Sequence, residues 1–250
     1  MASLHTWVIN LDRAPERLAR IGARLDALGV PWTRFPAVEG KLLTAADQAQ
    51  LLDRSGFERC HGMTPTLGEL GCYVSHVRVM QAFLDSAHDF ALILEDDVQP
   101  APGLPEALRQ LSEAHACWDM VKLSAIHSGT PVGVLALGQG HRMGVMLSRC
   151  TGASAYLVNR SAAQRYVQQL LPMQLPYDHA YDRGWVYGLK VRRVFPEVCV
   201  HDDQVVSTIG NPGPSRKFPW HRRLPTYAHR LRTEWARLRY GVAQLLWHRG

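Results

Sequence analysis

No stretch of this 250-residue sequence approaches the roughly 18 consecutive apolar residues that a membrane-spanning helix needs, so none of it is expected to cross a bilayer. The opening residues, MASLHTWVINLDR, lack a basic start followed by a long apolar core, and we expect no secretory signal. The five cysteines form no CxxC pair, which argues against a disulfide framework or a thiolate zinc site. A cytoplasmic protein with reduced thiols is the simplest expectation.

Positive charge is in short supply over most of the chain, although the formal net charge is +6. Residues 216–250 hold nine Lys or Arg residues and one acid, a charge of +8, so residues 1–215 carry 19 − 21 = −2. A nucleic-acid-binding protein would spread basic residues over its body, and this distribution argues against such a partner. The Gly- and Pro-rich segment 209–219 is the best boundary, and it predicts a domain over 1–210 and a basic tail over 211–250.

Strand and helix patterns alternate in the N-terminal part of the chain. Residues 4–12 are typical of a buried strand, residues 14–29 repeat apolar side chains at helical spacing up to a glycine, and residues 32–40 form a second candidate strand. Strand, helix and strand within 40 residues indicate a parallel βαβ unit and an α/β sheet.

A longer helix is predicted over residues 66–87. Thr66 followed three residues later by Glu69 forms a capping box, and the apolar residues that follow keep helical period. The helix leads almost directly into a strand over 90–98. Three further strands are expected, over residues 118–124, 152–159 and 190–195. One further helix is expected over residues 161–171.

The strand over 90–98 ends in three successive carboxylates, Glu95, Asp96 and Asp97. Ionised groups resist burial unless something positive neutralises them, and like neighbours repel. Ligands of α/β sheets bind outside the carboxyl ends of the strands, where this triplet falls. Glu95 and Asp97 point the same way along a strand, and paired hard oxygens suit Mg²⁺ or Mn²⁺. A solvated turn whose acids cap the next segment is the alternative from the triplet alone.

Several stretches occur in the order of a known family: VINLDRAPERLARIGARLDALGVPWTRFPAVEG, TPTLGELGCYVSHVRVM, ALILEDDV, WDMVKLS and TGASAYLVNRSAAQRYV. Together they resemble glycosyltransferase family 25, the lipopolysaccharide and lipooligosaccharide glycosyltransferases that also include collagen galactosyltransferases. The resemblance covers residues from about 5 to about 210. It implies a GT-A-like nucleotide-sugar fold with a mostly parallel central sheet. It also implies an inverting transfer and a divalent metal, Mn²⁺ or Mg²⁺, held by a DxD-type acidic motif.

The resemblance makes the triplet this acidic motif. It implies Asp97 as the direct metal ligand, and Glu95 or Asp96 as contacts to the metal, its waters or the donor ribose. His201 is implied to complete the metal shell, because many GT-A enzymes supply a late histidine.

The ends of the first two strands lie where such a fold receives the nucleotide. The candidate binding residues there and on the following helices are Asn10, Leu11, Asp12, Arg13, Arg17, Glu39, Glu69 and His76. Glu69 and His76 are seven residues apart, and the family pattern GExGCxxSH implies that their helix faces the site. Three alternatives stay open: Arg17 as a solvated helix residue, Glu69 as only the helix cap, and His76 as a satisfied core histidine.

An inverting transfer needs a base that takes the proton of the acceptor hydroxyl. Asp178 and Asp182 are four residues apart and share one face if their segment is helical. Asp178 stands at the family's DH position and is the first choice. Asp182 is the second, and it is able instead to pair with Arg183 or Arg192.

The basic tail predicts an amphipathic helix. Its apolar stripe consists of Tyr227, Leu231, Trp235, Leu238, Val242, Leu245 and Leu246. Its flanks are Arg232 and Arg239 on one side and Arg230 and Arg237 on the other. This pattern is typical of a helix lying in a membrane interface, with Trp235 and Trp247 near the boundary. Packing of the stripe on the protein's own body or on a second subunit is the alternative.

The resemblance therefore implies an inverting, metal-dependent hexosyltransferase that moves galactose or glucose from a UDP-sugar to a saccharide acceptor of lipopolysaccharide or a similar surface glycan. We expect it in the cytoplasm, held by the tail at the anionic inner face of the cytoplasmic membrane, where a lipid-linked acceptor lies. Two other classes compete with this prediction. A phosphotransfer module would need a Lys beyond a later strand, for which only Lys122 is available, and a nucleic-acid-binding protein would use the tail.

Overall fold

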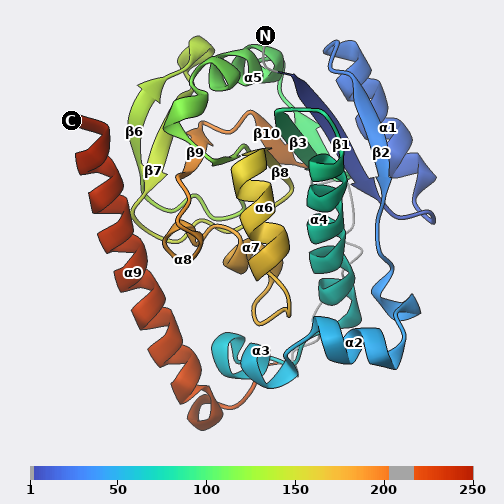
Figure 1. Ribbon diagram of the computed structural model, residues 1–250, viewed down its shortest axis with the longest axis vertical. Helices are drawn as coiled ribbons and strands as arrows, with labels where there is room; N and C mark the ends of the chain where they lie inside the picture. Colours follow the sequence, from blue (N-terminus) through green and yellow to red (C-terminus); the bar gives the residue numbers. More distant parts are fainter. Residues whose placement is uncertain (1–2, 203–216, 250) are drawn as a thin grey trace.

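The computed structural model of the chain describes residues 3–202 and 217–249. Its centre is an eight-stranded sheet, drawn with the helices in Figure 1. In spatial order the strands are β2 (Trp32–Pro36), β1 (Leu4–Asn10), β3 (Phe90–Glu95), β8 (Ala155–Asn159), β5 (Met120–Lys122), β9 (Val191–Phe195), β7 (Arg142–Met146) and β6 (Pro131–Ala136). Following the pairings across the sheet, only β8 and β7 among these run against the others. The expected mixed α/β fold with a mostly parallel sheet is confirmed.

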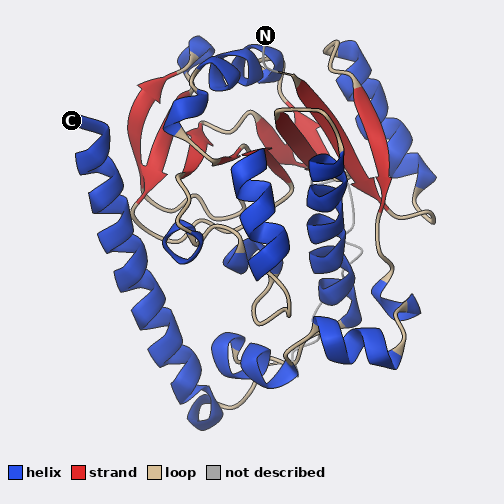
Figure 2. Ribbon diagram, in the orientation of Figure 1, coloured by secondary structure: helices blue, strands red, loops and turns tan. Residues whose placement is uncertain are grey.

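Helices cover both faces of the sheet, as Figure 2 shows. The helices of the described chain are α1 (Pro15–Ala27), α2 (Ala45–Leu51), α3 (Arg54–His61), α4 (Leu67–Asp85), α5 (Leu104–Glu113), α6 (Arg160–Gln169), α7 (Tyr177–Ala180), α8 (Gly184–Tyr187) and α9 (Leu224–Arg249). One apolar core joins α4, α6 and α7 to one face of the sheet, and a second joins α1 and α5 to the other. The strands between the cores are buried on both faces, which explains their nearly continuous apolar runs.

Local signals define the elements that carry the site. Pro15 occupies the first turn of α1, and Gly29 follows that helix with φ +64°. The predicted capping box of α4 is present: Thr66 Oγ1 accepts from the backbone N–H of Glu69, and Glu69 Oε2 accepts from the backbone N–H of Thr66. Because β1, β2 and β3 are parallel, their carboxyl ends meet at one edge of the sheet.

Several elements were not predicted from the sequence. They are α2, α3, α5, the β6–β7 hairpin, and a small sheet of β4 (Val98–Pro100) and β10 (Cys199–His201). The small sheet matters for the site, because it pairs His201 with Val98, one residue beyond the acidic triplet. The predicted boundary at residues 210/211 lies outside the described residues, and the boundary segment is described only from residue 217.

The C-terminal helix α9 runs along the flank of the molecule, from α3 at one end to β7 and β9 near the other (Figure 1). Polar contacts attach it to the body. Thr226 Oγ1 donates to the carbonyl of Arg59 (2.9 Å), and Tyr240 Oη donates to the carbonyl of Leu189 (2.6 Å). A buried ion pair joins Arg237 to Asp182, with Nη–Oδ distances of 3.0 and 3.2 Å. The polar face of α9 is therefore the one that meets the body.

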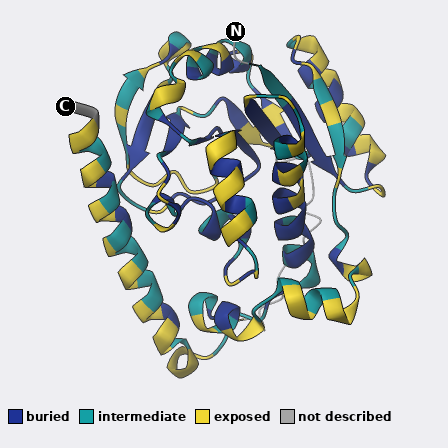
Figure 3. Cartoon of the chain, viewed as in Figure 1, coloured by how far each residue is buried: buried dark blue, intermediate teal, exposed yellow. Residues whose placement is uncertain are grey.

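The apolar stripe of α9 points away from the body, and Figure 3 shows the exposed residues along this helix. Leu231, Trp235 and Leu246 are 62%, 61% and 67% exposed. This excludes packing of the stripe on the described part of the body. One detail of the prediction was wrong: Arg237 does not flank an open surface but is buried, because its partner Asp182 lies in the body.

No helix in the described part of the chain combines the length and the apolar character that crossing a membrane requires.

Candidate functional site

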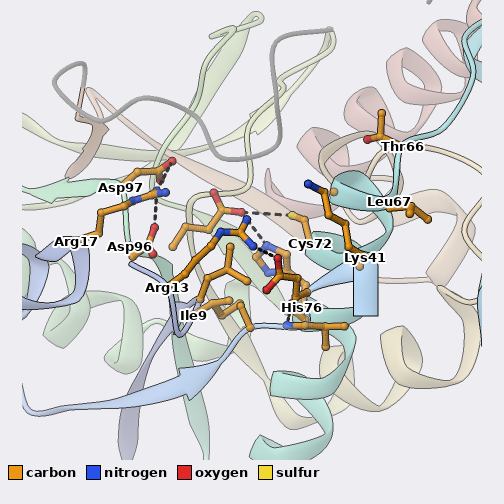
Figure 4. Close-up of a pocket in the computed structure, with 18 residues that line it drawn as sticks. Ile9, Arg13, Arg17, Lys41, Thr66, Leu67, Cys72, His76, Asp96 and Asp97 are labelled. Atoms are coloured by element: carbon orange, nitrogen blue, oxygen red, sulfur yellow. Dashed lines mark hydrogen bonds and ion pairs between the residues drawn. The ribbon is translucent and has the colours of Figure 1, made fainter. Parts of the chain in front are cut away.

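A cavity of about 510 Å³ opens at the carboxyl edge of the three parallel strands. Residues that directly follow β1, β2 and β3 line it, together with the first turns of α4, as Figure 4 shows. The sheet edge was predicted as the ligand site, and the cavity lies there. Its cationic side chains are Arg13, Arg17 and Lys41.

Two glycines bring the wall segments of this cavity close together. A Cβ on Gly40 would lie 1.7 Å from the carbonyl oxygen of Leu67, and a Cβ on Gly71 would lie 2.5 Å from that of Val38. The segment after β2 and the helix α4 therefore touch backbone to backbone, which only glycine permits at these positions. Any larger residue would push the two walls apart.

The residues predicted at the end of β1 separate into two groups. Leu11 and Arg13 line the cavity, and Arg13 forms an ion pair with Glu39, which also lines it. Asn10 is buried and holds the turn: its Nδ2 donates to the carbonyl of Ala14 (2.9 Å).

Two other predicted binding residues lie outside the cavity lining. The Asp12 side chain is 87% exposed and pairs with Arg34. Glu69 serves as the helix cap, which was the open alternative for it. His76 is buried and also lines the cavity. It therefore faces the site and, at the same time, occupies a hydrogen-bonded position in the core.

The three carboxylates of the acidic triplet have different partners. Asp96 is buried and is neutralised within the protein: it pairs with Arg17 and accepts from Asn10 Nδ2 at 2.7 Å. Burial raises the pKa of Asp96, while these two partners oppose that rise. Arg17 is itself buried and bound to the triplet, so it is not a solvated helix residue.

Asp97 is the carboxylate with too little positive charge around it. Its Oδ2 lies 3.4 Å from Arg17 Nη2, but its Oδ1 is buried and has no hydrogen-bond partner among the residues that the structure describes. Burial, and then the charge of Glu95, raise the pKa of Asp97 to about 7. A carboxylate in this state favours a nearby cation, because a cation would supply both the missing charge and the missing partner.

His201 is brought to Asp97 as predicted. The pairing of β10 with β4 places His201 Nδ1 3.7 Å from Asp97 Oδ2. The neighbouring Asp202 fixes this arrangement, because its backbone N–H donates to the carbonyl of Asp97 (2.8 Å) and its carboxylate binds Arg24 (2.7 Å). The structure thus places a carboxylate oxygen and an imidazole nitrogen side by side at the edge of the cavity.

Glu95 turns to a different set of partners on α4. Its Oε1 lies 3.0 Å from His76 Nε2 and 3.6 Å from Cys72 Sγ. Burial opposes the ionisation of Glu95, but the hydrogen bond and charge of His76 outweigh it and lower the pKa. Sequence reasoning missed Cys72 and Lys41. The i, i+4 spacing of Cys72 and His76 was the available signal for the first.

The two candidate bases do not share a helical face, because α7 ends before Asp182. Asp178 lies on α7, and its Oδ2 accepts from the backbone N–H of Gly152 (3.1 Å). Asp178 is not among the residues that line the cavity, but burial raises the pKa of Cys72, and the charge of Asp178 is a further cause of this rise. Asp182 is 3% exposed, and both of its oxygens accept from Arg237 rather than from Arg183 or Arg192, the partners considered as alternatives for it.

These features define an α/β protein with a cavity at the carboxyl ends of parallel strands and, beside it, a carboxylate whose pKa is raised. The family model for glycosyltransferase family 25 (LPS biosynthesis protein) matches residues 3–129. The chain belongs to glycosyltransferase family 25.

Individual relatives support this membership over different lengths. A glycosyltransferase 25 family member of Drosophila pseudoobscura pseudoobscura is 34% identical over 116 residues, which are 45% of this chain and 18% of the relative. The lacto-N-neotetraose biosynthesis glycosyltransferase LgtB of Neisseria gonorrhoeae is 24% identical over 220 residues, covering 80% of this chain and 75% of that protein. This chain thus matches less than a fifth of the insect relative's length.

The family also contains a relative named as a probable inactive member, from Bos taurus, which is 26% identical over 180 residues, covering 69% of this chain and 30% of that protein. Among solved structures, a glycosyltransferase involved in glycosylation of the major capsid of PBCV-1 aligns with a TM-score of 0.34 and 9% identity, covering 82% of this chain and 94% of that one.

Proposed function

We propose that this chain is an inverting, divalent-cation-dependent glycosyltransferase that moves a hexose, galactose or glucose, from a UDP-sugar to a saccharide acceptor of lipopolysaccharide or a similar surface glycan. The observation that carries the proposal is Asp97, a half-buried carboxylate beside the cavity of a family 25 protein, whose Oδ1 is buried without a hydrogen-bond partner in residues 3–202 and 217–249. The gonococcal relative, whose name places it in lacto-N-neotetraose biosynthesis, supports a saccharide as the acceptor.

Asp97 and His201 are the residues that would hold the cation, whereas Glu95 Oε1 is directed to His76 and Cys72. Bound there, Mn²⁺ or Mg²⁺ supplies Lewis-acid stabilisation of the charge on a departing nucleoside diphosphate. Arg13 and Lys41 line the same cavity and add positive charge for phosphate oxygens. Arg17 neutralises Asp96, so that the triplet is left with the charge of Glu95 and Asp97.

We propose Asp178 as the base. In this role its carboxylate takes the proton of the acceptor hydroxyl while that oxygen bonds to the anomeric carbon and the bond to the diphosphate breaks. The backbone N–H of Gly152 holds one carboxylate oxygen, and the Asp178 side chain remains 25% exposed. Asp182, in contrast, is buried against Arg237 and is not accessible to an acceptor.

A donor screen tests the proposed function. The full chain is incubated with Mn²⁺, a panel of UDP-, GDP- and CMP-sugars and saccharide acceptors ending in glucose, galactose or N-acetylglucosamine, and the released nucleotide is measured. We expect release from a UDP-hexose that depends on both Mn²⁺ and an acceptor. Release that is unchanged in chelator would contradict the cation dependence, and release from GDP- or CMP-sugars alone would contradict the donor.

We further propose that the outward face of α9 docks on an anionic membrane surface. The exposed stripe that includes Leu231, Trp235 and Leu246 is bordered by the exposed Arg232 and Arg239. Apolar side chains edged with arginine match the acyl boundary and the head groups of anionic lipid. Pairing of two copies about a two-fold axis is less favourable, because an isologous contact sets the same basic patch against itself.

The structure adds no support for the two competing classes of protein, a phosphotransfer module and a nucleic-acid-binding protein. Lys122, which a phosphotransfer module would need, is buried and donates to the carbonyl of Cys150 (2.7 Å), and it does not line the cavity. If the tail bound nucleic acid, Arg237 would not be accessible for it, because Arg237 is buried in its ion pair with Asp182.

A further inference from the structure

Three side chains with metal-ligating atoms lie close together in the wall of the cavity. Asp97 and His201 are not among them. Within the described residues, the ligand atoms of Cys72, His76 and Glu95 all lie within 4.8 Å of one another. Cys72 and His76 are one turn apart on α4, and Glu95 ends the neighbouring strand β3. Figure 4 shows Cys72 and His76 directed at the same point of the cavity.

Two of the three distances between these ligand atoms are close to the edges of a zinc tetrahedron. Bond lengths of about 2.0 Å to nitrogen and oxygen and about 2.3 Å to sulfur give ligand-to-ligand separations of roughly 3.3–3.6 Å. Here Glu95 Oε1 is 3.0 Å from His76 Nε2 and 3.6 Å from Cys72 Sγ. These two separations lie within a few tenths of an ångström of the roughly estimated ones, and the separation of the sulfur from the imidazole nitrogen is at most 4.8 Å.

A second layer of contacts orients the histidine. His76 Nδ1 lies 3.0 Å from the hydroxyl of Tyr156, which in turn lies 3.0 Å from the hydroxyl of Tyr177. The ring of His76 also stacks on Tyr177, with centroids 4.1 Å apart. A hydroxyl can accept as well as donate, so Tyr156 can hold His76 in the tautomer that leaves Nε2 free for a metal.

We propose that Cys72, His76 and Glu95 form a binding site for a thiophilic divalent cation of the zinc class, separate from the hard-cation site at Asp97 and His201. A sulfur, an imidazole nitrogen and a carboxylate oxygen are the ligands that zinc prefers, whereas Mn²⁺ and Mg²⁺ favour oxygen. Binding forms the metal–sulfur bond and releases the Cys72 thiol proton to solvent. All three residues line the cavity, so the fourth coordination position is open to it.

Cobalt absorption tests this site directly, because a Co²⁺–thiolate bond gives a charge-transfer band that oxygen and nitrogen ligands do not give. We expect the full chain to develop this band with one equivalent of Co²⁺ and to lose it on addition of Zn²⁺. Cys72→Ser should abolish the band and weaken Co²⁺ binding at least tenfold. The matched control, Cys117→Ser, changes another partly buried cysteine and should leave the band unchanged.

A second measurement on the unaltered protein covers the case in which Cys72→Ser does not fold. Maleimide labelling of each cysteine is followed by mass spectrometry, and Zn²⁺ should slow labelling of Cys72 at least tenfold but not that of Cys117. A protein without the cobalt band, a band that persists in Cys72→Ser, or equal labelling with and without Zn²⁺ would overturn the site. None of these readouts requires transferase activity, so failure of the proposed function leaves them intact.

Discussion

Two aspartates, the half-buried Asp97 at the cavity and the buried Asp182 under α9, have almost opposite surroundings. Asp182 is 3% exposed, and both of its oxygens accept from Arg237. The side chain of Asp97 is 12% exposed, but one of its oxygens has no hydrogen-bond partner in the described part of the chain, and burial together with the charge of Glu95 raises its pKa to about 7. The first carboxylate is satisfied by the fold, and the second is left in need of a cation. A buried carboxylate that the fold does not neutralise is the better indicator of function.

The largest change in turnover is expected from substitution of a third aspartate, Asp178, which we propose as the base. Asp178→Asn should lower turnover by about 10²- to 10⁴-fold, the usual contribution of general base catalysis, because the amide cannot take the proton. Binding of the UDP-sugar should change little, since the lost interaction belongs to the transition state. Steady-state kinetics and calorimetry measure the two quantities. A loss of donor binding as large as the loss of turnover would place Asp178 in the donor site instead.

The ion pair under α9 is tested by Arg237→Gln, which leaves Asp182 buried and unpaired. We expect the free energy of unfolding to fall by about 3–5 kcal/mol, the usual cost of breaking a buried pair. Arg239→Gln, two residues along on the exposed side of α9, is the matched control and should shift stability by at most about 0.5 kcal/mol. Urea unfolding measures both. Similar losses in the two variants would show that the pair does not hold α9 to the body.

The proposed role of Asp97 in binding the cation is tested by Asp97→Asn, which keeps the size of the side chain and removes its charge. Activity in Mn²⁺ should fall at least about a hundredfold, beyond the 10- to 100-fold losses seen when only the partners of a metal ligand are changed. Asp85→Asn, on the exposed end of α4, should have near-normal turnover. Near-normal turnover of Asp97→Asn would make the assignment of Asp97 to the cation wrong.

The same substitution should stabilise the metal-free protein. The pKa of Asp97 is raised in the folded state, so the unfolded chain binds fewer protons at this carboxyl group than the folded chain does. As the pH rises from about 4 to about 7, Asp97 therefore lowers the free energy of unfolding by a growing amount. Asp97→Asn removes this penalty. Its melting temperature in chelator should therefore exceed that of the unaltered protein at pH 8, and the difference should vanish near pH 4. A lower melting temperature at pH 8 would contradict the raised pKa.

The smallest expected effect concerns the exposed stripe of α9. Replacing Leu231, Trp235 and Leu246 together by serine removes apolar surface that does not contact the body, so the fold should be kept. Sedimentation with anionic vesicles should weaken at least about tenfold, because burying each of these side chains is worth more than 1 kcal/mol. High salt should also weaken binding of the unaltered protein. Equal sedimentation of both proteins would exclude docking through this face.

The elements around the cavity were predictable because their signals are local. The βαβ start, the capping box of α4 and the acidic end of β3 each lie within a short window of sequence. The hairpin β6–β7 and the helices α2 and α3 were missed. The hairpin strands mix buried, half-buried and exposed residues without regular alternation, and α2 has no fully buried residue.

The contacts within the site were harder to predict, because they join distant segments. A helical wheel found the apolar stripe of α9 but not its direction, which depends on the pair between Arg237 and Asp182, 55 residues apart. The spacing of Cys72 and His76 was visible, but the contribution of Glu95 requires the packing of β3 against α4. Acidity marked the whole triplet, whereas burial and partners separate Asp96 from Asp97.

Calorimetric titration of UDP into the full chain at pH 7.5, with Mn²⁺ and separately with chelator, tests most directly the claim that Asp97 needs a cation that accompanies the nucleotide. We predict binding at least about tenfold tighter with Mn²⁺, a difference of about 1.4 kcal/mol, and loss of that gain in Asp97→Asn. Equal affinity for UDP in Mn²⁺ and in chelator would contradict the account.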